Sequence, residues 1–209
     1  MRNLEVFRVL RSLSFKSLCV LLILNSIFLA TSCSKDDDES IPEPIMYAEE
    51  NPLTKYHEST GFTTVSNFIN AGNYEFGLVF SPNVKGKINA ITVKLPDANP
   101  NLKVTIWDYT AKTVLRTEIV NIAASNTLLT KAIEAFPLEK DKKYMITMNS
   151  NDWYKKNKPD NSNATYPITA GNIKFLEYRW VGASSQTFPT NVSLDYNGGD
   201  LSFNFQQTD

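Results

Sequence analysis

The feature of this sequence that most constrains its fold is a series of short runs in which apolar and polar residues alternate. In the run "YEFGLVF", residues 74–80, a large apolar residue occupies every second position. Successive side chains of a β-strand point to opposite faces, so each such run has one apolar face. The alternation predicts six inward-facing sets: Tyr74, Phe76, Leu78 and Phe80; Ile91, Val93 and Leu95; Leu102, Val104 and Ile106; Tyr144, Ile146 and Met148; Val192, Leu194 and Tyr196; and Leu201, Phe203 and Phe205.

Turn-forming residues separate these runs. Pro96-Asp97, Pro100-Asn101 and the hairpin-like "NGGD" at residues 197–200 are examples. We expect about ten strands, and the only helical segment expected is a short turn near residues 122–126. The predicted fold class is all-β, an antiparallel two-sheet β-sandwich of the jelly-roll or Ig-like kind.

The first 32 residues have the layout of a secretory signal peptide. Residues 1–16 are basic, and residues 17–30, "SLCVLLILNSIFLA", are apolar. A membrane-spanning helix needs about 20 apolar residues, whereas this stretch has 14 and contains Asn25 and Ser26. We therefore predict that residues 1–32 are a leader that is removed on export.

The leader ends at a cysteine. Cys33 follows the small residues Ala30, Thr31 and Ser32, which resembles the lipobox of bacterial lipoproteins, except that Ala30 stands where leucine is commonest. The resemblance implies that Cys33 is diacylated and that two acyl chains hold the protein to outer-membrane lipid.

An acidic run follows the cysteine almost directly. It resembles the signal that sends lipoproteins to the outer face of the outer membrane in one Gram-negative lineage rich in glycan-foraging surface lipoproteins. The residues concerned are Ser34, Lys35, Asp36, Asp37, Asp38 and Glu39. The alternative is a plain solvated tether, since blocks of like charge are usually disordered. We expect a flexible acidic tether over residues 33–50 and the β-sandwich domain over residues 51–209.

Charge and cysteine content exclude several classes of function. The net charge is −1, and the basic leader leaves the rest of the chain acidic, so a nucleic-acid partner is not expected. The two cysteines, Cys19 and Cys33, both precede the predicted domain. Disulfides, thiolate metal sites and cysteine catalysis are therefore excluded there, and we expect no cofactor.

The successive strands also resemble a known family. The segments "YEFGLVFSPNVKGKINAITVKL", "LKVTIWDYTAKTVL", "FPLEKDKKYMITM" and "YRWVGASSQTFPTNVSLDYN" are similar, in order, to the blocks of the bacterial domain-of-unknown-function family 4082. The Gly-Thr-His motif of that family is absent, and "PDANPN" stands in its place. The resemblance implies a secreted, surface-associated sandwich that accompanies carbohydrate-active or adhesive modules, with no catalytic residues to transfer.

Polar candidates for chemistry are few. The single histidine, His57, is expected at the surface or at an edge. A glycoside hydrolase would need two convergent acids, and the candidates are Glu75, Asp108, Asp152, Glu177 and Asp195. Calcium is conceivable at "DYNGGD" through Asp195, Asn197 and Asp200, but a hairpin turn is the preferred interpretation, and we assign no metal site.

Aromatic residues are the stronger candidates for binding. Trp153 and Tyr154 stand in a long polar stretch, residues 150–163, where exposed rings could stack on sugar rings. The alternative is that Trp153 folds back onto the open end of the core. Trp107 and Tyr109 form a second candidate platform, on the face opposite Val104 and Ile106. Tyr178 and Trp180 are expected in the core, on the same face as Leu176.

These observations favour a non-catalytic surface lipoprotein whose sandwich binds a polysaccharide or another extracellular ligand. A structural or adhesive module with a surface-protein partner is the alternative hypothesis. A glycoside hydrolase is the third.

Overall fold

The computed structural model of the protein describes residues 45–209, which contain fourteen strands and one helix. The predicted leader, Cys33, the export signal and the first part of the tether lie outside the described residues. About ten strands were expected. Two short strands, β1 (Glu49–Glu50) and β10 (Ile168–Ala170), were not among them, and strands of two or three residues leave no clear alternation pattern in the sequence. The single run predicted over Val192, Leu194 and Tyr196 is divided between β12 (Asn191–Ser193) and β13 (Tyr196–Gly198).

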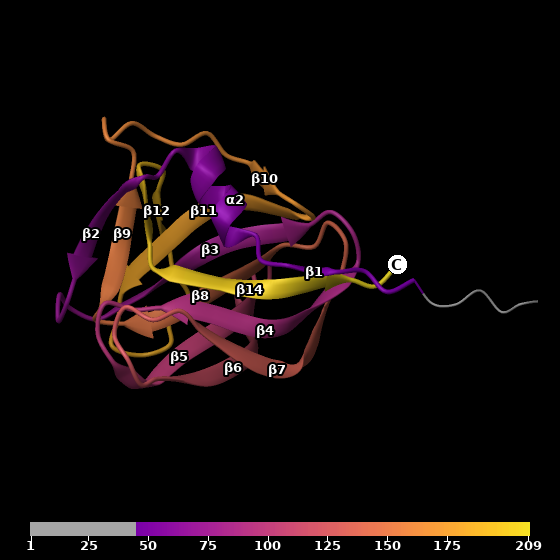
Figure 1. Cartoon of the computed structure of the whole chain (residues 1–209), viewed down its shortest axis with the longest axis horizontal. Helices are drawn as coiled ribbons and strands as arrows, with labels where there is room; N and C mark the ends of the chain where they lie inside the picture. The colour runs from indigo at the N-terminus through magenta and orange to yellow at the C-terminus, as the bar shows by residue number, and fades with distance from the viewer. Residues whose placement is uncertain (1–44) are drawn as a thin grey trace, which may run out of the picture. The chain divides into compact units, whose positions relative to one another are not determined.

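Two antiparallel sheets form the sandwich (Figure 1). The four-stranded sheet has the order β1 (Glu49–Glu50), β14 (Asp200–Gln207), β4 (Gly86–Lys94) and β7 (Leu129–Leu138). The seven-stranded sheet has the order β10 (Ile168–Ala170), β11 (Ile173–Gly182), β3 (Tyr74–Pro82), β8 (Tyr144–Ser150), β5 (Asn99–Asp108) and β6 (Thr113–Ile122), with β12 (Asn191–Ser193) paired to β11. The predicted fold class, an all-β sandwich, is confirmed.

The core lies between these two sheets and is built as the alternation predicts. The ring centroids of Phe80, on β3, and Phe203, on β14, are 4.7 Å apart across the sandwich. The inward sets predicted for β3, β4, β5, β8 and β14 all belong to this one hydrophobic cluster. Each fully buried side chain of this size contributes about 1.5–3 kcal/mol, so the sets hold the two sheets together.

A third sheet, not predicted from the sequence, lies at one end of the sandwich. It has three strands in the order β13 (Tyr196–Gly198), β9 (Trp153–Asn157) and β2 (Thr64–Phe68). Figure 1 shows β2 and β9 at the left end of the molecule. The expected loop over residues 150–163 is therefore wrong for Trp153–Asn157, which form the middle strand of this sheet.

The chain passes from the third sheet to the four-stranded sheet at Gly199. This residue has a φ of +85°, which glycine adopts without strain. β13 pairs with β9, whereas β14 pairs with β4 and β1. The hairpin expected at residues 197–200 is therefore wrong, because the flanking strands pair in different sheets.

One helix, α2 (Leu53–Thr60), precedes the third sheet. The Oδ1 of Asn51 accepts a hydrogen bond from the backbone N–H of Leu53, at 3.1 Å, and Gly61 ends the helix in the left-handed conformation. The helical turn expected near residues 122–126 does not form, and the helix lies here instead. In residues 45–209, no helix has the length and apolar character to cross a membrane.

Two predicted faces differ from the structure. Val192 and Leu194, expected inside, are 44% and 39% exposed, because β12 is a three-residue strand on the rim. In β11, Leu176 points to the outer face of the seven-stranded sheet, and a register shift between Phe175 and Glu177 turns Tyr178 to the inner face. Tyr178 is buried in the main core as predicted, but not on the face of Leu176.

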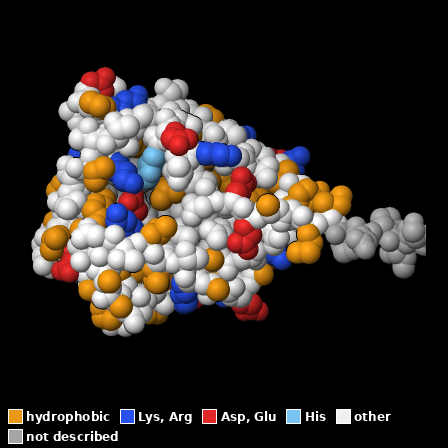
Figure 2. Space-filling model, viewed as in Figure 1, with side chains coloured by type: hydrophobic (Ala, Val, Ile, Leu, Met, Phe, Trp, Pro, Cys, Tyr) orange, Lys and Arg blue, Asp and Glu red, His pale blue; other side chains and the backbone are white. Residues whose placement is uncertain are grey.

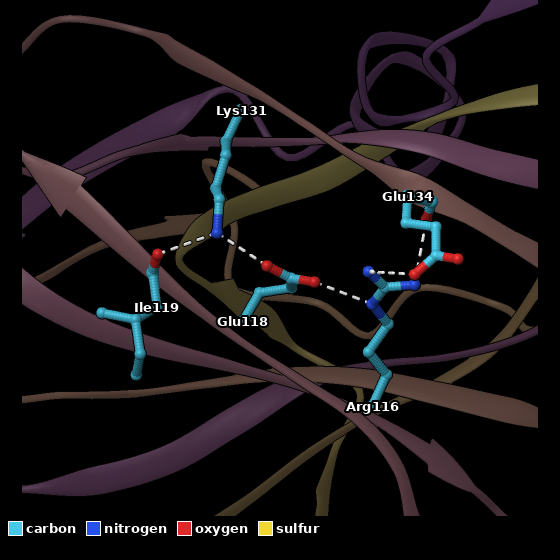
Figure 3. A network of polar contacts seen from close by, with 5 residues as sticks. All are labelled: Arg116, Glu118, Ile119, Lys131 and Glu134. Atoms are coloured by element: carbon cyan, nitrogen blue, oxygen red, sulfur yellow. Dashed lines mark hydrogen bonds and ion pairs between the residues drawn. The ribbon is translucent and has the colours of Figure 1, made fainter.

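The open edge between β6 and β7 is closed by charged side chains (Figure 3). Glu118 accepts from Arg116 Nε at 2.7 Å and from Lys131 Nζ at 2.6 Å. Arg116 also donates to the carbonyl of Glu134 on β7, and Lys131 donates to the carbonyl of Ile119 on β6. The network therefore bridges the two sheets where no backbone ladder joins them.

Candidate functional site

An aromatic pocket of about 220 Å³ opens between the three-stranded sheet and the β3–β11 end of the seven-stranded sheet. We call it the aromatic pocket. Its floor consists of Phe76 and Tyr178, which are each 3% exposed. Its half-buried rim is formed by Phe68, Tyr74, Trp153, Lys155, Trp180 and Tyr196.

Strand geometry explains why these rings converge. Residues paired across antiparallel strands point to the same face. Phe68 pairs with Trp153, and Gly198 pairs with Lys155. Trp153, Lys155 and Phe68 therefore share the face of the third sheet that looks toward β3 and β11.

The rings of the rim are arranged at different angles. Trp153 stacks on Phe68 with centroids 5.3 Å apart and meets Tyr74 nearly edge-on at 5.2 Å. Tyr74 in turn meets Trp180 at 6.0 Å. These offset and edge-to-face contacts are the favourable aromatic geometries, so the rim is fixed before any ligand arrives.

Glycine lets the chain pass close to the pocket floor. A side chain at Gly198 would overlap the hydroxyl of Tyr178, whose pKa is raised well above its usual value by burial. A side chain at Gly199 would meet Met148 and Phe76. The small residues therefore allow β13 to cover the floor without filling the pocket.

The structure separates the two residues predicted as a binding pair. Trp153 lines the aromatic pocket and also packs against the main core, so its packing agrees with the alternative interpretation, and its role in binding stays a prediction. Tyr154 points to the other face of β9, is 6% exposed and donates to Asn126. Tyr154 is therefore not on the open, ring-exposing loop that the sequence predicted.

Trp107 and Tyr109 lie on the outer face of the seven-stranded sheet, opposite Val104 and Ile106 as expected. Trp107 is 4% exposed and donates from Nε1 to Thr147 at 2.8 Å. Phe188, in the segment between β11 and β12, packs on both rings. Trp107 is therefore covered, by this segment and not by the N-terminal one, and offers no open platform.

The same outer face buries an acid. Glu75 is fully buried and accepts a hydrogen bond from the hydroxyl of Thr147, while its Oε2 has no partner. Burial raises the pKa of Glu75 to about 7, against the opposing hydrogen bond from Thr147. Asn149 donates to the carbonyls of Ala183 and Ser185 beside it, so the β11–β12 segment is held over the acid.

His57 lies in a polar cluster on the far side of β9. Its Nε2 is 3.2 Å from Asn197 Nδ2 and its Nδ1 is 3.4 Å from Lys156 Nζ. Burial, followed by the charge of Lys156, lowers the pKa of His57 to about 3. Figure 2 shows the histidine in pale blue at the surface, near basic and acidic side chains. It is half-buried and hydrogen-bonded, not a plain surface residue.

The calcium candidate and the acid candidates can be placed in the same way. Asp200 pairs with Lys156 Nζ at 2.6 Å, so an ammonium already occupies the position a cation would take. Among residues 45–209 no group of three or more His, Cys, Asp or Glu side chains could hold a metal ion. The aromatic pocket has no acidic residue in its lining, and Glu177 is paired with Arg179 on the outer face.

Most of the pocket has no clear signal in the sequence. Only Trp153 was named for binding, while Phe68, Tyr196 and Lys155 were not. Several of the strands begin or end with an aromatic residue, and this pattern was the available signal for the pocket. The pattern shows that the rings converge only once the pairing of the strands is known.

Neither a scan against models of protein families nor a search of curated proteins found a match to this chain. The resemblance to family 4082 therefore stays a prediction.

Proposed function

We propose that this chain is a surface-exposed outer-membrane lipoprotein whose non-catalytic sandwich binds a glycan in the aromatic pocket. The lipid anchor at Cys33 and the acidic run after it come from the sequence alone. The observation that carries the binding proposal is the pocket itself, in which seven aromatic side chains and one lysine surround about 220 Å³.

The size and lining of the pocket support a sugar ring as ligand. A cavity of about 150 Å³ holds a benzene molecule, so this volume accommodates one substituted six-membered ring. The apolar C–H faces of a pyranose pack on aromatic faces, and a few polar groups orient it. A ring at the end of a chain or on a branch would fit, because the pocket is open to solvent on one side.

Affinity electrophoresis tests this proposal. The purified full chain, in detergent, would be run against plant, host and microbial polysaccharides, with tryptophan fluorescence as a second readout. We expect retardation by at least one glycan class and a fluorescence change, because Trp153 and Trp180 line the pocket.

Two substitutions in the pocket and one outside it locate the site. Trp153→Ala and Phe68→Ala are each expected to weaken binding about tenfold or more, since buried aromatic contacts dominate such sites. Tyr154→Phe is the matched control, because Tyr154 is adjacent in sequence but points away from the pocket. Unchanged binding in both pocket variants, with the fold intact, would place the site elsewhere.

A structural or adhesive role is the second candidate. The observation that favours it is the apolar surface of edge strand β6, where Val114, Leu115 and Ile119 are 45%, 41% and 49% exposed. Exposed apolar surface is a common protein contact site. Association between chains without any glycan binding would favour this role.

A further inference from the structure

The side chains that line the aromatic pocket carry a positive charge and no negative charge. Lys155 is the only charged residue in the lining, which includes no Asp, Glu, Asn or Gln. The remaining polar atoms are the indole N–H groups of Trp153 and Trp180 and the tyrosine hydroxyls. Trp180 already donates to Ser193 at 3.0 Å. The pocket therefore holds one positive charge and no anionic acceptor.

Lys155 has no acidic partner of its own in the part of the chain that the structure describes. No Asp or Glu oxygen of residues 45–209 is within 4.0 Å of its ammonium group, which instead lies 4.5 Å from the ring centroid of Tyr196. Lys156, the next residue, pairs with Asp200 on the opposite face. Of two adjacent lysines, one is neutralised within the fold and the other faces the pocket.

A half-buried ammonium beside apolar rings has lost part of its hydration, and an anionic partner would compensate for this loss. The ring contact with Tyr196 holds the ammonium at the pocket edge without neutralising it. A neutral sugar could hydrogen-bond to Lys155 but would not neutralise its charge.

We propose that the ligand of the aromatic pocket is an acidic pyranose, a hexuronate ring whose carboxylate pairs with Lys155 while its apolar face packs on the rim aromatics. This inference rests on the proposed function and specifies its substrate class. The ammonium of Lys155 gives the preference for a carboxylate, and the aromatic rings of the rim give the preference for the apolar face of a sugar.

The test compares one oligosaccharide in two chemical forms. An oligouronate and the same oligosaccharide after reduction of its carboxylates to primary alcohols would be titrated into the full chain, followed by tryptophan fluorescence. We expect the acid form to bind at least about tenfold tighter, the effect of one charge-assisted hydrogen bond, and the preference to weaken as salt is raised.

Two lysine variants identify the group responsible. Lys155→Met keeps the aliphatic stem and should abolish the preference for the acid form. Lys94→Met is the matched control, because Lys94 also lies over a tyrosine ring, Tyr154 at 5.4 Å, but outside the pocket. The thermal midpoint of each variant reports whether the fold is retained.

The outcomes separate the two proposals. Equal binding of acid and reduced forms that is lost in Trp153→Ala would overturn the uronate inference and leave glycan binding standing. The same preference for the acid form in Lys155→Met and wild type would overturn the role of Lys155. Binding of neither form, when another glycan class binds in the pocket, would also overturn the uronate inference, and no glycan binding at all would overturn both.

Discussion

Glu75→Gln is the substitution whose effect the structure defines most sharply. Glu75 is fully buried beneath the segment between β11 and β12, and only one of its carboxylate oxygens has a partner. Its pKa is raised to about 7. Glutamine has nearly the same shape but cannot ionise, so it isolates the cost of the buried charge.

The magnitude follows from the pKa. A pKa of about 7 in the folded state against the ordinary 4.5 corresponds to about 3 kcal/mol, since each tenfold change in proton affinity is about 1.4 kcal/mol. Below pH 4.5 the acid is protonated in both states and costs nothing. Between pH 4.5 and 7 the unfolded chain releases the proton first, so the free energy of unfolding falls as pH rises. Above pH 7 the full cost applies.

His57 acts in the opposite direction over part of this window. Its pKa is about 3 in the fold against the usual 6.5, so the unfolded state binds more protons between these values and stability rises with pH there. The wild-type profile between pH 4.5 and 6.5 therefore combines two opposing slopes. Only the difference between wild type and Glu75→Gln separates them.

The assay is urea unfolding of the full chain, followed by tryptophan fluorescence, from pH 4.5 to 8.5. We expect Glu75→Gln to gain about 3 kcal/mol relative to wild type between the two ends of this range. A constant cost from the new buried amide group shifts the whole difference curve but not its slope. Glu58→Gln, an exposed acid on α2, is the control. A difference curve for Glu75→Gln that is flat with pH would refute the reasoning.

Two further substitutions test the packing and the ion network. Gly77→Ala would place a methyl group against the backbone carbonyl of Ile146 on β8. Because the backbone of β8 cannot move aside without breaking its pairing, we expect the free energy of unfolding to fall by about 1–3 kcal/mol or more, which would lower the urea midpoint. An unchanged midpoint would contradict the close β3–β8 contact. Glu118→Gln tests the network between β6 and β7. Burial opposes ionisation of Glu118, but hydrogen bonds from Lys131 and Arg116 outweigh it and hold its pKa below the usual value. Its contribution should therefore be present above pH 4.5 and lost as pH falls through the lowered pKa, so we expect this variant to lose about 1 kcal/mol at pH 7 and less at pH 3. A loss of the same size at both pH values would show that the effect is not electrostatic.

Some features that were not predicted do have signals in the sequence. Asn51 and Pro52 before α2 and Gly61 after it are ordinary helix start and stop signals, and the helix was missed because its apolar periodicity is weak. The bulge in β11 had no such signal. It turned Tyr178 to the inner face and left Leu176 on the outer one, because a bulge inserts a residue and shifts the alternation that follows it.

The class of the fold and the inner faces of β3, β4, β5, β8 and β14 can be predicted from the sequence alone, because alternation with a period of two is a local property of the chain. The other features depend on the tertiary structure. The aromatic pocket forms because β2, β9 and β13 pair into a third sheet beside β3 and β11. Glu75 is buried because a segment about a hundred residues later in the chain covers it. Strand pairing and the burial of a side chain by a distant segment both depend on contacts between residues far apart in sequence, which no local pattern encodes.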